Sequence, residues 1–198
     1  MKKRLIILGI LICIFLFFSI VVLSNDIKYD FRKTNWGMSE QEVKASENRE
    51  ILEIYQDGFA YKDKISGLNC NTVYQFTESK LYIAGYIFTE LYTNYDRWID
   101  DYHQLKSLLT KKYGESVKSG EFWSSETHKD MWSDGQNLGT AVGMGYLVYY
   151  TEWDTPKTKI WIGLKGDSFE VDLRIIYESK ELEEWVKQIK EKEALKEF

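Results

Sequence analysis

Apolar and polar side chains alternate in several short stretches of the chain, and this two-residue period predicts β-strands. The clearest alternation runs through residues 68–76 and places Cys70 on the buried face of a strand. Gln56-Asp57-Gly58 separates residues 51–55 from residues 59–65. Because Asp-Gly is a strong hairpin turn, these two segments are predicted to be paired strands.

The other predicted strands lie further along the chain. Residues 81–88 are apolar on both faces, which is typical of a central strand. Three more strands are expected at 142–150, 160–164 and 169–175. Gly143 and Gly145 share one face of the first of these, where missing side chains would let a helix or an aromatic ring approach closely.

A period of 3.6 residues predicts the helices. A short helix is expected to begin at Ser39, because Ser39 and Glu42 form an S-x-x-E capping box. Ser179 is expected to cap a final helix. The longest helix has one apolar stripe, formed by Tyr95, Trp98, Ile99, Tyr102, Leu105, Leu108 and Leu109.

The elements follow one another as helix, strands, longer helix, strands and helix. Short hairpin turns make a sheet antiparallel, so the chain is predicted to be an α+β protein with helices packed on one face of the sheet. The helix-then-strands pattern occurs twice. This would fit a structural duplication, although the residue identity between the two halves is slight.

Residues 1–24 are expected to be an N-terminal membrane anchor or signal segment. Lys2, Lys3 and Arg4 precede an uncharged apolar run at 5–23, which as a helix would be about 28 Å long and would match the ~30 Å bilayer core. This length favours an uncleaved anchor, and cleavage near Ser24 with secretion is the alternative. Basic residues stay in the cytoplasm, so residues 25–198 are expected to form one extracytoplasmic domain, held at the cell membrane by a single pass.

Charge and cysteine content exclude several classes of function. The chain has a net charge of −5, and its charges before residue 25 are all basic, so the remainder is more acidic still. Such a surface repels phosphate backbones, and no nucleic-acid partner is expected.

Cys13 lies in the apolar run, which leaves Cys70 as a lone thiol. An internal disulfide, a CxxC redox pair and a cysteine-rich zinc site are therefore excluded, and Cys70 is expected to be an inert buried side chain.

The sequence lacks the motifs of several enzyme classes. It has no G-x-S-x-G, H-E-x-x-H, P-loop, dinucleotide glycine fingerprint or EF-hand loop, and its two histidines exclude a site that needs three. We therefore expect no catalytic residue, no metal and no cofactor. A pair of carboxylates of the glycosidase kind is the alternative, since the separation of acids is not visible in a sequence. Asp100 and Asp101 would point about 100° apart on a helix, which favours a solvated helix edge for them.

Residues 124–138 are expected to form a long loop, and loops of this length are often functional or disordered. The loop contains His128, Met131 and Trp132, and Trp123 comes just before it. These four residues are the candidate partner-binding residues, because exposed tryptophans are efficient anchors. The alternative is that both tryptophans fold back over the sheet edge. The aromatic content of 16% likewise has a structural and a functional interpretation. The aromatic side chains either pack against each other across strands or form a platform for glycans.

Several short motifs carry a family resemblance. They are F-R-x-x-x-W-G-M-S-x-x-E-V from Phe31 to Val43, Tyr74-x-Phe76, Lys80-Leu81 and the LLTKKYG run that ends at Gly114. With these motifs the chain resembles an uncharacterised family of membrane-anchored or lipoprotein-type surface proteins, mainly from Gram-positive bacteria. The helix start at Gly37-Met38-Ser39 is also similar to SmpA/OmlA domains and to the β-lactamase-inhibitor-protein fold. The resemblance implies a small non-enzymatic binding or scaffolding domain and transfers no site residues.

Together these patterns predict a membrane-anchored extracytoplasmic binding or interaction domain without catalytic activity. The expected partners are the membrane, through the N-terminal helix, and a protein or glycan of the cell envelope. Two alternatives remain. One is a hydrolase of envelope polymers that uses paired carboxylates in a cleft, and the other is a ligand-sensing accessory to a membrane protein.

Overall fold

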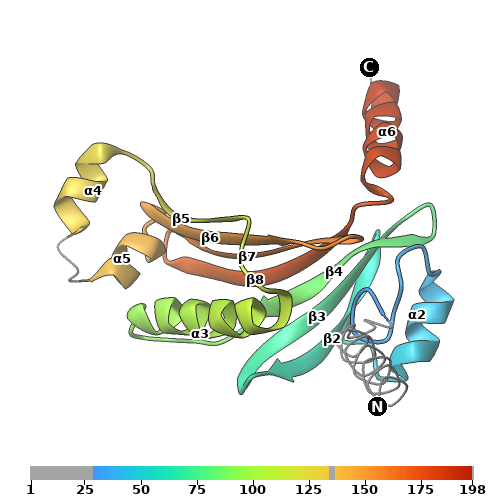
Figure 1. Ribbon diagram of the computed structural model, residues 1–198, viewed down its shortest axis with the longest axis horizontal. Helices are drawn as coiled ribbons and strands as arrows, with labels where there is room; N and C mark the ends of the chain where they lie inside the picture. Colours follow the sequence, from blue (N-terminus) through green and yellow to red (C-terminus); the bar gives the residue numbers. More distant parts are fainter. Residues whose placement is uncertain (1–28, 134–136, 198) are drawn as a thin grey trace, which may run out of the picture.

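The computed structural model describes residues 29–133 and 137–197 (Figure 1). These residues form one eight-stranded antiparallel sheet and five α-helices, which confirms the predicted α+β class. The expected anchor segment, residues 1–24, lies outside the described residues. Among the helices of the described part, none is both long and apolar enough to cross a membrane.

The elements have the following bounds. The helices are α2 (Glu40–Glu47), α3 (Asp96–Tyr113), α4 (Glu126–Trp132), α5 (Leu138–Gly143) and α6 (Glu183–Ala194), and a 3₁₀ turn follows at Leu195–Glu197. The strands are β1 (Glu53–Tyr55), β2 (Gly58–Ile65), β3 (Leu68–Thr77), β4 (Lys80–Phe88), β5 (Lys118–Trp123), β6 (Leu147–Asp154), β7 (Thr158–Asp167) and β8 (Glu170–Ser179).

The strands lie side by side in the order β1-β2-β3-β4-β8-β7-β6-β5. Strands β1 to β4 form one meander and strands β5 to β8 form a second, and the two meet where β4 pairs with β8. Equivalent strands of the two meanders therefore occupy equivalent positions on either side of the β4–β8 pair. The repeated helix-then-strands pattern of the sequence recurs as an N-terminal half (α2–β4) and a C-terminal half (α3–β8) of one sheet.

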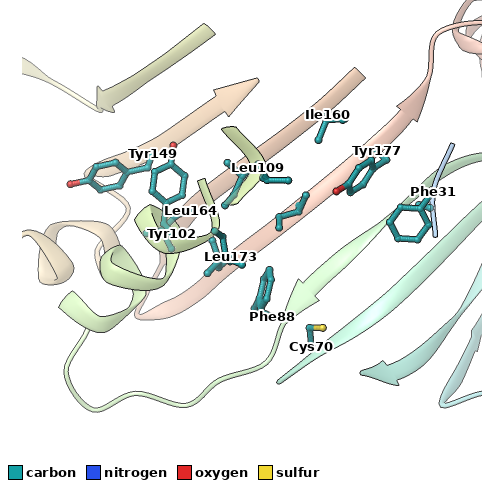
Figure 2. Packing of buried hydrophobic residues seen from close by; sticks show 14 of the residues in the cluster. Phe31, Cys70, Phe88, Tyr102, Leu109, Tyr149, Ile160, Leu164, Leu173 and Tyr177 are labelled. Carbon is teal, nitrogen blue, oxygen red and sulfur yellow. The ribbon is translucent and has the colours of Figure 1, made fainter. Parts of the chain in front are cut away.

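One face of the sheet, the inner face, carries the hydrophobic core (Figure 2). Helices pack on it: the hydroxyls of Tyr102 on α3 and Thr151 on β6 are 2.7 Å apart, and Tyr74 of β3 donates a hydrogen bond to Glu47 of α2. Helix α6 instead rises from the other side of the sheet, near the start of β4 (Figure 1). The prediction that the helices pack on one face of the sheet is therefore confirmed for α2, α3 and α5 and wrong for α6.

The segment with the resemblance motif has a structural role. Its predicted capping box is present, with the Ser39 hydroxyl accepting from the Glu42 amide and the Glu42 carboxylate accepting from the Ser39 amide. Ahead of this helix, the Trp36 indole donates to the Thr158 hydroxyl of β7 over 2.9 Å. Gly37 and Met38 exchange backbone hydrogen bonds with Leu81. The motif therefore ties α2 to strands of both halves.

Three local predictions were wrong. Residues 142–146 are not part of a strand, because α5 ends at Gly143 and β6 begins at Leu147. The expected loop after residue 123 contains the helix α4, and β5 lies where the polar sequence gave no strand signal. Helix α6 begins at Glu183, so the Ser179 hydroxyl accepts from the Leu182 amide in the turn before the helix and does not cap it. In each case contacts with distant residues outweigh the local pattern.

The predicted approach of an aromatic ring is confirmed at Gly143 but not at Gly145, and neither glycine lies in a strand. A Cβ atom on Gly143 would lie 3.0 Å from the Phe169 ring and 3.4 Å from the Tyr95 ring. A Cβ atom on Gly145 would lie 3.0 Å from the Gly166 carbonyl oxygen. The missing side chains therefore let two rings and the backbone of β7 pack against the end of α5.

Candidate functional site

The most extensive candidate surface is the side of the sheet opposite the core, which we call the open face. Strand alternation assigns side chains to it, and the register aligns Val73 of β3, Gly85 of β4, Ile176 of β8 and Trp161 of β7 in one row. Most of its apolar side chains are half-buried and Phe122 is 46% exposed, whereas Ile176 is buried. The apolar members are Val73, Ile83, Ile87, Phe122, Val148, Tyr150, Trp161 and Ile176.

Glycines make the middle of the open face flat. A Cβ atom on Gly85 would lie 2.8 Å from the tip of the Ile176 side chain, and one on Gly163 would lie 3.3 Å from the Trp161 ring. A Cβ atom on Gly120 would lie 3.5 Å from the Phe122 ring. Neighbouring side chains therefore lie over the glycines, and the result is a continuous apolar surface without projecting side chains at these points.

Carboxylates on the open face are held by hydrogen bonds within the protein. The Trp161 indole donates to Glu178 over 2.8 Å, and the Tyr150 hydroxyl donates to Glu152 over 2.7 Å. Burial raises the pKa of Tyr150 above its usual value of 10, and the Glu152 carboxylate raises it further. Asp172 pairs with Arg174 on the same strand.

Three lysines on the same face are available for ion pairs with another molecule. The side chains of Lys62, Lys159 and Lys165 form no ion pair or hydrogen bond with a described residue. Lys118 lies over the rings of Phe122 and Tyr150, 5.7 and 5.5 Å from their centroids. The open face thus presents free ammonium groups around an aromatic centre, in a chain that is acidic as a whole.

The four candidate partner-binding residues lie elsewhere, at the β5 edge. Trp123 and Trp132 are half-buried and pack against the core, and the Trp132 indole nitrogen is buried without a hydrogen-bond partner. His128 stacks on Tyr146 with ring centroids 3.8 Å apart, and its Nδ1 is 2.8 Å from the Ser124 hydroxyl. Met131 is 64% exposed. The contacts of the two tryptophans match the alternative in which they cover the sheet edge, and partner binding by the four residues stays a prediction.

A cavity of about 440 Å³ opens beside the start of α3. It lies between the β4–α3 connection and the β7–β8 turn, and Glu90 and Glu170 are among its lining residues. The hydrolase alternative requires a cleft lined by two acids with raised pKa values. Nearby, burial raises the pKa of Asp101, which accepts a hydrogen bond from Tyr92 over 2.7 Å. Asp101 is not one of the residues that line the cavity, whose two acidic lining residues are Glu90 and Glu170. Catalysis by a pair of carboxylates stays a prediction.

Cys70 is buried as expected and 1% exposed. Burial raises the pKa of its thiol to about 12, so the reactive thiolate is scarce at neutral pH. Within the described residues, no group of three or more His, Cys, Asp or Glu side chains is arranged to hold a metal ion.

Sequence reasoning missed the residues that shape both candidate sites. Trp161 lies between Ile160 and Ile162, so that segment is apolar on both faces and the pattern does not show which side is open. Phe122 lies in a stretch without recognisable periodicity. Tyr92 and Phe169 belong to connections, where a sequence gives no indication of which distant turns meet. Comparisons of the chain with protein-family models, curated proteins and solved structures find no match.

Proposed function

We propose that this protein is a membrane-anchored, extracytoplasmic interaction domain that binds a partner protein through the open face of its sheet. The observation that carries the proposal is the flat apolar surface centred on Trp161 and Phe122, on the side of the sheet opposite the core. Contiguous exposed apolar surface on a folded domain marks an interaction site. Tryptophan and tyrosine at its centre are the residue types that contribute most to protein interfaces.

The size of the surface fits a protein partner. From β2 to β5 the sheet has seven strands and six spacings, which at about 4.8 Å each span roughly 29 Å. An eight-residue strand such as β2 is about 26 Å long, so the face covers roughly 750 Å². A standard protein interface buries about 800 Å² on each partner. A surface of this area and flatness fits another protein better than a small molecule, which binds in a concave pocket.

The charges define the partner's chemistry. A hydrogen bond from the neutral Tyr150 or Trp161 does not neutralise a carboxylate, so the open face carries charges of both signs. Its ammonium groups without an ion-pair partner among the described residues are those of Lys62, Lys159 and Lys165. A complementary partner has an apolar centre and acidic side chains at its rim, since potentials across an interface are complementary. The apolar run at 5–23 would hold the domain at the membrane, and its basic flank would leave residues 25–198 outside.

Site-specific photo-crosslinking in the native cells tests the proposal. A photoreactive phenylalanine analogue at Phe122 should crosslink one defined protein, and Trp161→Ala should lower the yield about tenfold or more, as expected for an interface hot spot. The matched control is the same analogue at Leu108 on α3, which is 41% exposed on the helical side. Equal crosslinking from both positions, or none from Phe122, would refute binding through the open face. Crosslinking to wall glycan instead would identify the glycan partner.

Paired carboxylates remain the second candidate function, because the cavity brings Glu90 and Glu170 together. A hydrolase predicts that the purified protein releases soluble fragments from cell-wall polymers. Glu90→Gln or Glu170→Gln should then lower this release by a factor of about 100 or more. Fragment release that is unchanged in both variants would exclude the cavity as its source.

A further inference from the structure

Four aromatic residues line the cavity beside α3 as two pairs, which we call its aromatic walls. The rings of Tyr92 and Trp98 have centroids 5.1 Å apart, and those of Tyr95 and Phe169 are 5.5 Å apart. Its volume of about 440 Å³ lies within the range of small-ligand sites, which is about 300–1,000 Å³. The cavity is therefore large enough for a small organic group that packs against several rings.

The charged lining of the cavity is entirely acidic. Glu90 and Glu170 line it, whereas no lysine, arginine or histidine does. One oxygen of Glu90 accepts a hydrogen bond from the Asn69 amide over 2.5 Å, which leaves its other oxygen for a ligand. The nearest basic group on α3, Arg97, lies over the Tyr92 ring, 4.2 Å from its centroid. Carboxylates only accept hydrogen bonds at neutral pH, so a matching ligand carries N–H donors or a positive charge. An anionic ligand would be repelled.

Phe169 is held in place by its backbone. Its φ is +68°, an uncommon conformation for a bulky residue, and its amide donates to the Gly143 carbonyl over 2.8 Å. The absence of a side chain at Gly143 leaves room for the ring, which is 48% exposed. Ser168, with a φ of +50°, and Phe169 form the two-residue loop of the β7–β8 hairpin, and a type I′ turn in such a loop needs a positive φ at both positions. The hairpin turn therefore fixes the position of the Phe169 ring.

Tyr92 is fixed as well. Its hydroxyl donates to Asp101 of α3 over 2.7 Å. Burial, together with this hydrogen bond, raises the pKa of Tyr92 to about 12, so the ring stays neutral at physiological pH. One aromatic ring on each wall is thus held by a polar contact outside the cavity.

We propose that this cavity binds an organic cation, an alkylammonium or guanidinium group held against its aromatic walls and neutralised by Glu90 and Glu170. A cation over the face of an aromatic ring is attracted by the ring's quadrupole, and the attraction grows when the cation is partly desolvated. The group would be either a free small molecule or the side chain of a basic peptide. Alternation along β8 places Glu170 on the same side as Asp172 and Ile176, so the cavity adjoins the open face at the end of this strand. Its test uses other ligands and other variants, and is independent of the proposed protein interaction.

Titration of the full-length protein in a maltoside detergent tests the site, with ligand binding followed by the backbone amide NMR signals of residues 90–98 and 168–171. The probes are choline and its neutral isostere 3,3-dimethylbutanol, which has the same shape without the charge. Choline should bind about tenfold more tightly than the isostere, and its affinity should fall as salt is added. Nα-acetyl-lysine methylamide should bind as well if a basic peptide is the natural source, and choline alone should bind if it is a small molecule.

Three variants locate the binding. Phe169→Leu keeps an apolar side chain but removes the ring, and Glu170→Gln removes a charge at constant shape. Each should weaken choline binding by a factor of about three to ten. Phe169→Tyr should restore it, which separates loss of the ring from loss of folding. Phe122→Leu on the open face is the matched control and should leave choline binding unchanged.

Equal binding of choline and 3,3-dimethylbutanol would overturn the proposal, because it would show an apolar site without charge recognition. Stronger binding of N-acetylglucosamine than of choline would also overturn it and would identify a neutral sugar site. A small cation is expected to bind weakly, with a dissociation constant below about 50 mM. If the NMR signals of the cavity residues do not shift with up to about 50 mM choline, the cavity binds no organic cation.

Discussion

A group of charged side chains links the N-terminal loop, α2 and β2. The Arg32 guanidinium donates to both oxygens of Glu47, over 3.0 and 3.3 Å, and to Asp63 over 2.6 Å. Glu47 is 4% exposed and also accepts from the Tyr74 hydroxyl over 2.6 Å. Removing the Arg32 side chain would leave the buried Glu47 carboxylate without its ion-pair partner, which costs about 3–5 kcal/mol. These residues therefore hold α2 on the inner face and are structural.

Asp63 in this group makes stability depend on pH. Burial by itself raises the pKa of Asp63, but hydrogen bonds from Thr72, the Lys64 amide and Arg49, with the charge of Arg32, lower it to about 2 from the usual 3.8. Because the folded pKa is the lower one, the ionised group stabilises the fold above pH ~4, and this contribution is lost as the pH falls towards ~2.

Asp63→Asn should therefore lower the free energy of unfolding by about 1–2 kcal/mol at pH 7 and flatten its pH dependence between about pH 4 and 2. Urea unfolding at a series of pH values measures both effects. Asp130→Asn on the exposed surface of α4 is the control and should leave the profile unchanged. An Asp63→Asn profile as steep as that of the wild type would show that other carboxyls govern acid unfolding.

Two helices depend on a glycine where they meet. The Gly139 amide, in the first turn of α5, donates to the Asp96 carboxylate at the start of α3 over 2.7 Å. A Cβ atom on Gly139 would lie 2.3 Å from the Asp96 backbone nitrogen, which is far inside van der Waals contact. Any side chain at this position would push α5 away from α3 and displace the backbone of Tyr95 and Asp96.

Gly139→Ala should therefore destabilise the protein by about 1–3 kcal/mol, the usual cost of overpacking. Thermal or urea unfolding measures it. Gly120→Ala on β5 is the matched control, because the nearest contact of its Cβ would be the Phe122 ring at 3.5 Å, and stability should change by less than about 0.5 kcal/mol. Similar stability of the two alanine variants would mean that α5 and α3 can separate without cost.

At the scale of the whole molecule, the N-terminal and C-terminal halves share one core. Strands β4 and β8 pair directly, and the rings of Phe31 and Tyr177 lie 4.9 Å apart across the boundary. The Trp36 indole bonds to Thr158 of the other half. Since neither half covers its boundary side chains alone, the two are expected to unfold together.

Tyr177→Ala tests this expectation, because the Tyr177 side chain is 5% exposed at the boundary. The substitution should lower stability by about 3–5 kcal/mol. Native-state hydrogen exchange should show the same decrease for amides of β3 in the N-terminal half and of β6 in the C-terminal half. A decrease confined to one of these strands would show that the halves unfold separately.

The sequence by itself determined the elements whose signals are local. The capping box at Ser39 and the apolar stripe of α3 lie within one or two helical turns, and both appear in the structure with Trp98, Tyr102, Leu105 and Leu109 buried. Alternation along residues 68–76 likewise placed Cys70 on the buried face, because the strand period is two wherever the strand pairs.

Tertiary structure alone decided the rest. Val142 and Gly143 form the end of helix α5 where alternation predicted the start of a strand, because the backbone of α5 packs closely against Asp96 and Gly166. Strand β5 exists through its pairing with β6 and has no apolar period of its own. Contacts between residues far apart in the chain decide which tryptophans are covered and which glycines lie under rings. They also decide which connections meet around the cavity. A local pattern carries no information on such contacts, and so the fold class could be predicted from the sequence but the candidate sites could not.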